Sequence, residues 1–206
     1  LSARNRELQD FAFIASHDLQ EPLRKVRAFA DRLANGYAAQ LSGQGLEYLE
    51  RMSSAVARMQ RLIDALLDYS RVLSHARPLV PVDLNLVLRG VLEDLEVRLR
   101  DSGGAVELSA LPRVFGDASL LGQVFQNLIA NALKFHASGR APLVRLSVRS
   151  AQLAGADAWQ IDVADNGIGL EPEFSEKIFA PFQRLHGRAV YDGTGIGLAV
   201  VRRIVE

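Results

Sequence analysis

The sequence contains no cysteine, which excludes a disulfide framework and any metal site built on thiolates. It also lacks an unbroken apolar run of the roughly 18 residues that a membrane-spanning helix needs. Its 24 basic and 24 acidic side chains cancel, so the chain as a whole has no net charge that would attract nucleic acid or acidic membranes. These absences predict a cytoplasmic location, no membrane segment in this stretch and no nucleic-acid partner.

The composition is that of a folded protein, because 49% of the 206 residues are hydrophobic. This length allows one large domain or two small ones. No targeting segment precedes the first helical residues, and the sequence ends within an apolar series at helical spacing, Leu198, Val201, Ile204 and Val205. We therefore interpret the chain as a fragment with a truncated C-terminal domain.

The first 73 residues or so carry no strand pattern, and their apolar residues recur at the spacing of two amphipathic helices. A break rich in glycine and serine, from Gly36 to Gly45, separates the helices and predicts an antiparallel hairpin. One hairpin has too little core to bury both apolar stripes, so a second copy is the simplest partner, which gives a four-helix bundle in a homodimer. Packing of the hairpin onto the C-terminal half is the alternative. We place the hairpin domain at residues 1–76 and a second domain at residues 77–206.

Beyond two prolines near residue 80, strand and helix patterns alternate. Asp83 or Asn85 can cap a helix that runs to about Arg100, and Asp117 can cap another that runs through Phe135. Three segments read as strands: residues 105–109, 143–150 and 159–164. This order predicts an α/β sandwich, in which helices cover one face of a mostly antiparallel sheet. The chain as a whole is therefore predicted to be α+β.

Three polar side chains share one face of the helix that Asp117 begins. Asn127, Asn131 and Lys134 are spaced by four and three residues, which places them side by side. An amide oxygen can ligate Mg²⁺, and a lysine ammonium can lie against a phosphate. Asparagine pairs on helices are more often ordinary surface residues, so this segment alone does not establish a metal or phosphate site.

A strand then leads into the turn Asp-Asn-Gly-Ile-Gly, which contains Asp165, Gly167 and Gly169. A carboxylate at the end of a strand can accept a hydrogen bond from the exocyclic amine of adenine. The glycines allow the backbone to approach a ligand closely. The same Asp-Asn-Gly sequence also suits a plain hairpin turn.

The last helix opens with Gly-Thr-Gly-Ile-Gly-Leu, residues 193–198, whose backbone N–H groups can face an anion such as a phosphate. The segment matches neither the dinucleotide-binding nor the Walker fingerprint. Between the two glycine-rich segments, Phe179 and Phe182 can anchor a lid that carries Arg184 and Arg188. Two phenylalanines at this spacing are more often core residues.

These four segments, in this order and at these spacings, resemble the N, G1, F and G2 boxes of the histidine-kinase ATP-binding domain, whose fold is shared with gyrase, Hsp90 and MutL. The segment Phe-Ile-Ala-Ser-His-Asp-Leu-Gln-Glu-Pro-Leu-Arg, residues 13–24, resembles the H box of the dimerisation and phosphotransfer hairpin, in the form of kinases that follow phytochrome and PAS-type sensors. The resemblance covers nearly the whole chain. It implies a sensor histidine kinase core that uses ATP to phosphorylate His17 and passes the phosphoryl group to an aspartate of a response-regulator receiver domain, with the sensor domain upstream of this fragment.

The resemblance also implies the roles of individual residues. Asn131 would ligate Mg²⁺, Asn127 and Lys134 would support the triphosphate of ATP, and Asp165 would bind the adenine amine. The other expected nucleotide-binding residues belong to the glycine-rich segments and the lid: Gly167, Gly169, Tyr191, Gly193, Thr194, Gly195, Gly197 and Leu198.

The chemistry of His17 fits this role. An imidazole titrates near pH 6.5, so at neutral pH its unprotonated ring nitrogen can attack the γ-phosphorus. Asp18, the second expected catalytic residue, can hold the proton on the other nitrogen. The family usually has glutamate after the histidine and threonine or asparagine three residues later, where this chain has Asp18 and Glu21. The first change keeps a carboxylate, whereas the second replaces a neutral water-orienting group that phosphatase activity would use.

Two other functions are open to a chain of this kind. One is ATP hydrolysis, for which gyrase and Hsp90 relatives have a glutamate four residues before the metal-binding asparagine; here that position is Asn127, which favours transfer to a side chain. The other is a dimeric signalling scaffold without catalysis. An ATP-binding assay discriminates the scaffold from the kinase.

Overall fold

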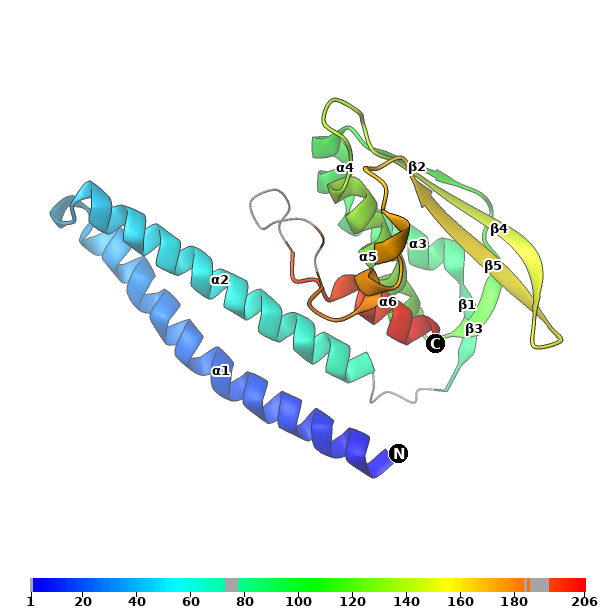
Figure 1. The fold of residues 1–206 in the computed structure, drawn as a ribbon, viewed down its shortest axis with the longest axis horizontal. Helices are drawn as coiled ribbons and strands as arrows, with labels where there is room; N and C mark the ends of the chain where they lie inside the picture. Colours follow the sequence, from blue (N-terminus) through cyan, green and yellow to red (C-terminus); the bar gives the residue numbers. More distant parts are fainter. Residues whose placement is uncertain (1, 73–77, 184, 186–192) are drawn as a thin grey trace. The chain divides into compact units, whose positions relative to one another are not determined.

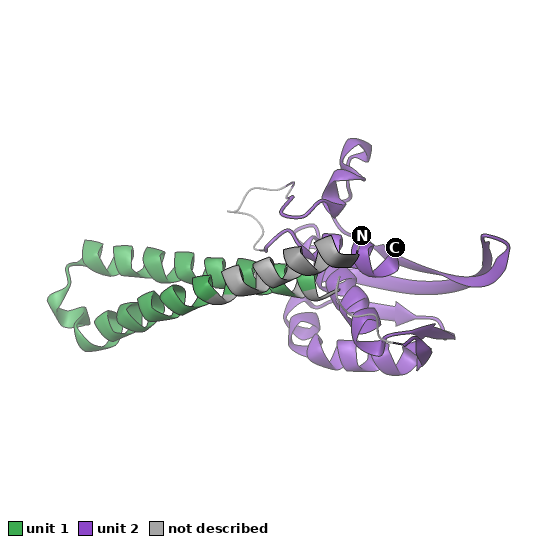
Figure 2. Cartoon of the chain, turned by 90° about the horizontal axis from the view of Figure 1, so that it is seen from below, with its two compact units in different colours: residues 1–75 green, residues 76–206 purple. Residues whose placement is uncertain are grey.

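The computed structural model describes residues 2–72, 78–183, 185 and 193–206, without the side chains of residues 2–15, 17, 68, 71 and 72. The chain divides into two compact units, Leu1–His75 and Ala76–Glu206 (Figure 1, Figure 2). No helix in the described part of the chain has both the length and the apolar character that crossing a bilayer requires.

The first unit is an antiparallel helical hairpin, as the sequence predicts. Helix α1 (Ser2–Gly36) is followed by the short 3-10 helix η1 (Ala38–Gln40) and then by α2 (Gly43–Val72). Gln20 donates from Nε2 to Asp64 Oδ1 over 2.9 Å, which joins the two helices. The break between the helices lies in the glycine- and serine-rich segment, where the helical apolar pattern stops.

Contact between α1 and α2 buries a narrow seam and leaves a second apolar stripe uncovered. Among the described side chains of the two helices, the buried seam includes Ser16, Ala30, Leu49, Val56 and Leu67. The uncovered stripe includes Leu19 at 55% exposure, Phe29 at 61%, Met52 at 50% and Met59 at 43%. Two helices offer only one surface of mutual contact, so the wider apolar face that each one carries remains available to a partner.

The second unit packs helices against a small mixed sheet. Strand β2 (Ala105–Leu108) pairs in parallel with β4 (Leu143–Leu153), and β4 pairs antiparallel with β5 (Ala156–Asp165). Strands β1 (Val80–Asp83) and β3 (Arg113–Gly116) form a separate antiparallel pair. The predicted α+β fold, a helical hairpin followed by an α/β sandwich, is confirmed. The elements of this unit in order are β1 (Val80–Asp83), α3 (Leu84–Asp94), α4 (Glu96–Ser102), β2 (Ala105–Leu108), β3 (Arg113–Gly116), α5 (Ala118–Lys134), β4 (Leu143–Leu153), β5 (Ala156–Asp165), the 3-10 helices η2 (Pro172–Phe174) and η3 (Lys177–Phe179), and α6 (Gly197–Val205).

The helix expected to run to about residue 100 is divided in two. Asp83 caps α3 by accepting the Asn85 N–H over 3.0 Å, but α3 ends at Asp94 and α4 begins at Glu96. Leu95 between them has φ −96° and ψ 2°, outside ordinary helical geometry, and its side chain is buried in the core. The apolar pattern is continuous across this break, which is why periodicity alone does not reveal it.

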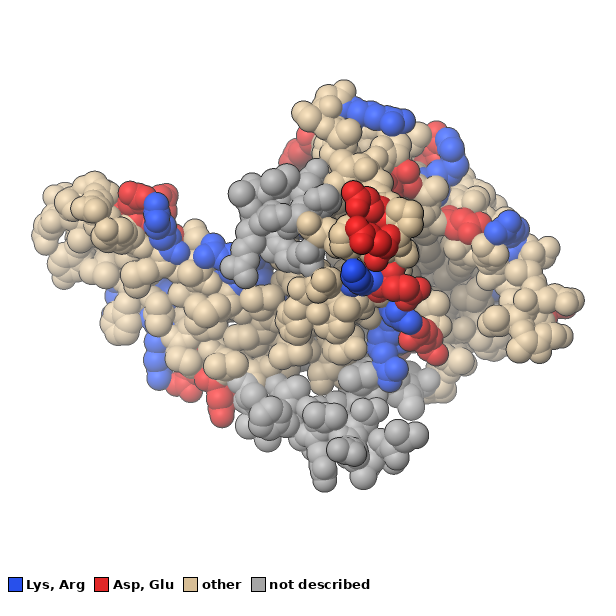
Figure 3. Space-filling view, in the orientation of Figure 1, with Lys and Arg blue, Asp and Glu red and all other residues tan. Residues whose placement is uncertain are grey.

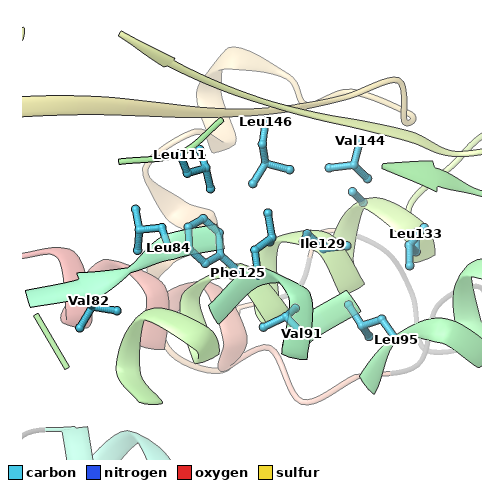
Figure 4. Close-up of a cluster of buried hydrophobic side chains, with 12 residues drawn as sticks. Val82, Leu84, Val91, Leu95, Leu111, Phe125, Ile129, Leu133, Val144 and Leu146 are labelled. Carbon is cyan, nitrogen blue, oxygen red and sulfur yellow. The ribbon is translucent and has the colours of Figure 1, made fainter. Parts of the chain in front are cut away.

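The core lies between the three-stranded sheet and helices α3 and α5 (Figure 4). Along β4, Val144 and Leu146 are buried while Arg145 and Ser147 are exposed, as the alternation of a strand requires. The helices contribute Leu84, Leu88 and Val91 from α3 and Phe125, Ile129 and Leu133 from α5, and Leu95 adds to the core from between α3 and α4. The face of α5 opposite these core residues contains Asn127, Asn131 and Lys134.

Candidate functional site

Helix α5 carries the central polar face of the candidate site. Asp117 begins the helix by accepting the N–H groups of Ser119 and Leu120 over 2.8 and 3.2 Å. We define the polar face of α5 as Asn127, Asn131 and Lys134. Asn127 and Lys134 are about 10 Å apart along the helix axis, and Asn131 lies between them.

The glycine loop, residues 193–197, rests on both ends of this polar face. A Cβ atom on Gly197 would lie 2.8 Å from Asn127 Oδ1, and a Cβ atom on Gly193 would lie 2.8 Å from Lys134 Nζ. Glycine at both positions leaves room for these approaches; with a Cβ there, the Asn127 amide or the Lys134 ammonium would have to move aside. The structure thus brings four of the predicted nucleotide-binding residues together and places Asn131 between the two contacts.

The conformation of the glycine loop explains its composition. Gly193 and Gly195 have φ angles of 148° and 74°, which glycine adopts at little cost. Helix α6 begins at Gly197, the last residue of the loop, and its N-cap residue, Ile196, provides no side-chain hydrogen bond. The N–H groups of its first turn therefore suit an anionic ligand. The predicted residues Thr194 and Leu198 are half-buried within this segment.

The turn that contains Asp165 is fixed to the C-terminal end of α5. Asp165 closes β5, and its Oδ1 accepts the N–H of Gly167 over 2.8 Å. The next N–H, that of Ile168, donates to the carbonyl oxygen of Phe135 over 2.9 Å. A Cβ atom on Gly167 would overlap that carbonyl oxygen, so glycine is required there. Gly169 follows with φ 75°, a second left-handed position.

Two residues that the sequence did not single out build this junction. Asn166 accepts the Leu143 N–H at Oδ1 over 2.8 Å and donates from Nδ2 to the Ala141 carbonyl over 3.1 Å, which joins the turn to the start of β4. The ring of Phe135 lies 4.3 Å from Lys134 Nζ, a cation–π distance. Asn166 directly follows Asp165, and Phe135 directly follows Lys134. Their position next to a predicted site residue is the signal by which the sequence could have indicated them.

The segment between the two glycine-rich elements is attached to α6. Arg202 Nη1 lies 3.1 Å from Glu176 Oε2, and its guanidinium carbon lies 5.9 Å from the centre of the Phe179 ring. A hydrogen bond to Glu206, followed by the attraction of that carboxylate and a hydrogen bond to Glu176, raises the pKa of Arg202 above its usual value. Figure 3 shows the acidic and basic side chains interspersed over this region.

Phe182 joins the lid segment to the glycine loop through its backbone. Its N–H donates to the Gly195 carbonyl oxygen over 2.9 Å, while the residue as a whole is 52% exposed. Its φ of 64° is unusual for a bulky residue. The predicted lid residues Arg184, Arg188 and Tyr191 lie outside the described residues.

The two predicted catalytic residues belong to the first unit. The backbone of His17 forms part of α1, but its side chain is outside the described part of the structure. Ser16 beside it is 1% exposed, and Asp18 is exposed. One turn further along, Glu21 Oε1 lies 2.7 Å from Lys25 Nζ.

The donor set of the second unit fits a magnesium–triphosphate group. Among the described residues, no three histidine, aspartate or glutamate side chains gather as a metal site. On the polar face of α5, Asn131 instead lies between Asn127, which is next to Gly197, and Lys134, which is next to Gly193. A metal that takes one protein amide oxygen and completes its shell with phosphate oxygens and water suits this arrangement.

Two family models match the chain. The model for the histidine kinase-, DNA gyrase B- and HSP90-like ATPase matches residues 116–206, from just before α5 through α6. The model for the His Kinase A (phospho-acceptor) domain matches residues 7–74, nearly the whole hairpin.

Curated relatives align with the whole chain. Phytochrome-like protein Cph1 of Synechocystis sp. is 40% identical over 206 residues, which are 100% of this chain and 27% of the relative. Sensor histidine kinase AruS of Pseudomonas aeruginosa is 33% identical over 216 residues, which are 99% of this chain and 21% of the relative. The chain spans about a quarter of the length of these relatives.

A solved structure shares both units. Full-length ShkA in complex with AMPPNP has a TM-score of 0.65 and 28% identity, and the match covers 95% of this chain and 40% of the ShkA chain. Because both a phosphoacceptor hairpin and an ATPase-type domain are matched in the order observed here, the chain belongs to the sensor histidine kinase family.

Proposed function

We propose that this chain is the kinase core of a two-component sensor, in which ATP held by the second unit phosphorylates His17 of the hairpin. An unprotonated ring nitrogen of His17 attacks the γ-phosphorus, the bond from that phosphorus to the β–γ bridging oxygen breaks, and ADP leaves. Asp18 holds the proton on the other ring nitrogen. The observation that carries the proposal is the glycine loop seated on the polar face of α5.

The nucleotide roles follow from the chemistry of the residues. Asn131 supplies an oxygen ligand to Mg²⁺, and Lys134 compensates phosphate charge, with Asn127 supporting the same group. Asp165 accepts a hydrogen bond from the adenine amine through the carboxylate oxygen that does not bond Gly167. The remaining proposed contacts are the glycines and their neighbours: Gly167, Gly169, Tyr191, Gly193, Thr194, Gly195, Gly197 and Leu198.

The hairpin has a separate role in this proposal. Residues 1–76 form the dimerisation and phosphotransfer domain, and residues 77–206 form the ATP-binding domain. The uncovered stripe of α1 and α2 is the surface that a second copy covers, since burying it forms a four-helix bundle. A response-regulator receiver aspartate is the proposed acceptor, and a sensor domain upstream supplies the signal.

The experiment is phosphoryl incorporation from ATP labelled at the γ-position. Wild-type protein should retain label, and His17→Gln should retain none while still binding ATP. His75→Gln is a matched control, because it removes a histidine to which we give no role, and it should be labelled normally. Label that persists on His17→Gln contradicts the proposed acceptor, and phosphate released to solution without protein labelling favours ATP hydrolysis instead.

A further inference from the structure

A side chain prolongs the ladder between β4 and β5 at the point where β5 ends. Val144 and Asp165 are the last two residues in register. One position further, the Asn166 N–H donates to the Leu143 carbonyl oxygen over 3.2 Å, as in the backbone of an antiparallel pair. The return bond goes to a side chain, because the Leu143 N–H donates over 2.8 Å to Oδ1 of Asn166. The Asn166 side chain thus takes the place of a backbone carbonyl in the last bond of the ladder.

The same amide makes a second bond along the start of β4. Its Nδ2 donates to the Ala141 carbonyl oxygen over 3.1 Å. A primary amide carries an acceptor and a donor on one planar group, as a peptide unit does. The Asn166 side chain therefore stands in for the next peptide unit of β5. The backbone meanwhile leaves the sheet for α5, where the Ile168 N–H bonds the Phe135 carbonyl oxygen.

The Asp165 carboxylate is held between these two attachments of the turn. Asn166 is fixed to the start of β4, and Ile168 is fixed to the end of α5. Gly167 lies between them, and its N–H donates to Asp165 Oδ1 over 2.8 Å, which closes an Asx turn. Because a carboxylate is planar, this bond also directs its other oxygen. The direction of that second oxygen therefore depends on the bonds that Asn166 makes.

We propose that Asn166 is a positioning residue for adenine recognition, whose amide holds the turn so that the Asp165 carboxylate faces the exocyclic amine. This rests on the proposed function, in which Asp165 accepts a hydrogen bond from that amine. A site built around an oriented hydrogen-bonding group discriminates strongly against a ligand that lacks the matching group. Asn166 acts through Asp165, so it sets the selectivity for the amine and leaves the binding of sugar and phosphates unchanged.

The test compares ATP with purine riboside triphosphate, which has the same ring, sugar and phosphates but no exocyclic amine. Wild-type chain should bind ATP about tenfold or more tightly than this analogue. Asn166→Ala removes both amide bonds, so it should weaken ATP binding about tenfold and change binding of the analogue by less than about twofold. An equal loss for both nucleotides would overturn the proposal.

A double-variant cycle shows whether Asn166 acts through the carboxylate. In an Asp165→Asn background, Asn166→Ala should weaken ATP binding by less than about twofold, because the acceptor that it positions is already gone. Losses that multiply in the double variant would mean that the two residues act independently. That result would also overturn the proposal.

Asn85 offers a matched control, because its amide makes the same two kinds of backbone bond elsewhere in the second unit. At the start of α3 it accepts the Leu111 N–H at Oδ1 over 3.0 Å and donates from Nδ2 to the Leu111 carbonyl oxygen over 2.7 Å. Asn85→Ala should lower the melting temperature, as Asn166→Ala should, but keep the wild-type ratio of the two affinities. A ratio that falls with the melting temperature in both variants would contradict a positioning role.

Asn166→Asp decides the question if Asn166→Ala does not fold. Aspartate can still accept the Leu143 N–H but cannot donate to the Ala141 carbonyl oxygen, so its preference for ATP should fall only partly; a wild-type preference would overturn the proposal. Failure of the wild-type chain to bind ATP would remove the proposed nucleotide site, and equal wild-type affinities for the two nucleotides would remove the role of Asp165. A wild-type preference for ATP that survives in Asn166→Ala removes only the role of Asn166.

Discussion

Ile168 donates its backbone N–H to the carbonyl oxygen of Phe135 over 2.9 Å, and this single bond joins the Asp165 turn to the end of α5. This bond attaches Asp165, which we propose recognises adenine, to the helix that carries Asn131, which we propose ligates the metal. Gly167, which precedes Ile168 in the turn, allows the turn to approach the end of α5 this closely.

Gly167→Ala should disrupt this junction. Its new Cβ would overlap the Phe135 carbonyl oxygen and come 2.6 Å from Asp165 Oδ1, and backbone cannot move aside as a side-chain end can. We expect a loss of about 1–3 kcal/mol in the free energy of unfolding and a clear loss of ATP affinity. Gly90→Ala is the control, because a Cβ there meets nothing within 4 Å, and it should stabilise α3 by about 0.5–1 kcal/mol without affecting ATP. Wild-type affinity in Gly167→Ala would contradict the role of the turn.

Asp165→Asn should weaken ATP binding without unfolding the turn. The asparagine oxygen can still accept the Gly167 N–H, which Asp165 now accepts over 2.8 Å, but the carboxylate oxygen proposed for adenine is lost. Loss of a hydrogen bond to a charged acceptor, worth about 1.5–3 kcal/mol, predicts roughly tenfold to hundredfold weaker binding in a titration. The melting temperature should remain near that of wild type. Equal affinities in the two proteins would exclude Asp165 as the adenine acceptor.

Asp83 should make stability depend on acid pH. The hydrogen bond from the Asn85 side chain, then that from the Asn85 backbone, lowers the pKa of Asp83 below its ordinary 3.8. A lowered folded-state pKa means that the stabilisation is present above pH 3.8 and is lost as the pH falls through the lowered value. Urea unfolding of Asp83→Asn should therefore show a shallower loss of stability below pH 4 than wild type. Parallel curves for the two proteins would contradict this role of the cap.

Ala154→Asn should stabilise the hairpin of β4 and β5. Ala154 and Gly155 join the two strands with φ angles of 51° and 81°, both in the left-handed region. Asparagine tolerates this region better than alanine, and Asn-Gly is the preferred pair for a two-residue loop of this kind. We expect a gain of up to about 1 kcal/mol in the free energy of unfolding, measured with urea. Ala156→Asn, one residue beyond the loop in β5, should give no gain, because asparagine is disfavoured in strands.

Local signals predicted much of the fold. Helix α5 was expected between Asp117 and Phe135 and spans Ala118–Lys134 with those two residues as its caps, because a capping carboxylate and a strong apolar period are both local. Strands β1 and β3 were not predicted as a pair. Strand β1 includes Pro81, which reads as a break in the pattern, and β3 is a four-residue segment that directly follows Pro112 and ends in Gly116.

The site could be predicted in its composition but not in its contacts. The residue types of the polar face and of the glycine loop point to phosphate chemistry, since amide, ammonium and backbone N–H groups suit it. The contact of Asn127 with Gly197 joins residues 70 positions apart and depends on how α6 packs on α5. No local pattern encodes that distance.

Phosphorylation of His17 by bound ATP can be observed by mass spectrometry of the chain after incubation with ATP and Mg²⁺. We predict one added phosphate that maps to the peptide containing His17 and is lost on acid treatment. An acid-stable phosphate on a hydroxyl residue, or a phosphate on a different histidine, would exclude His17 as the phosphoryl acceptor.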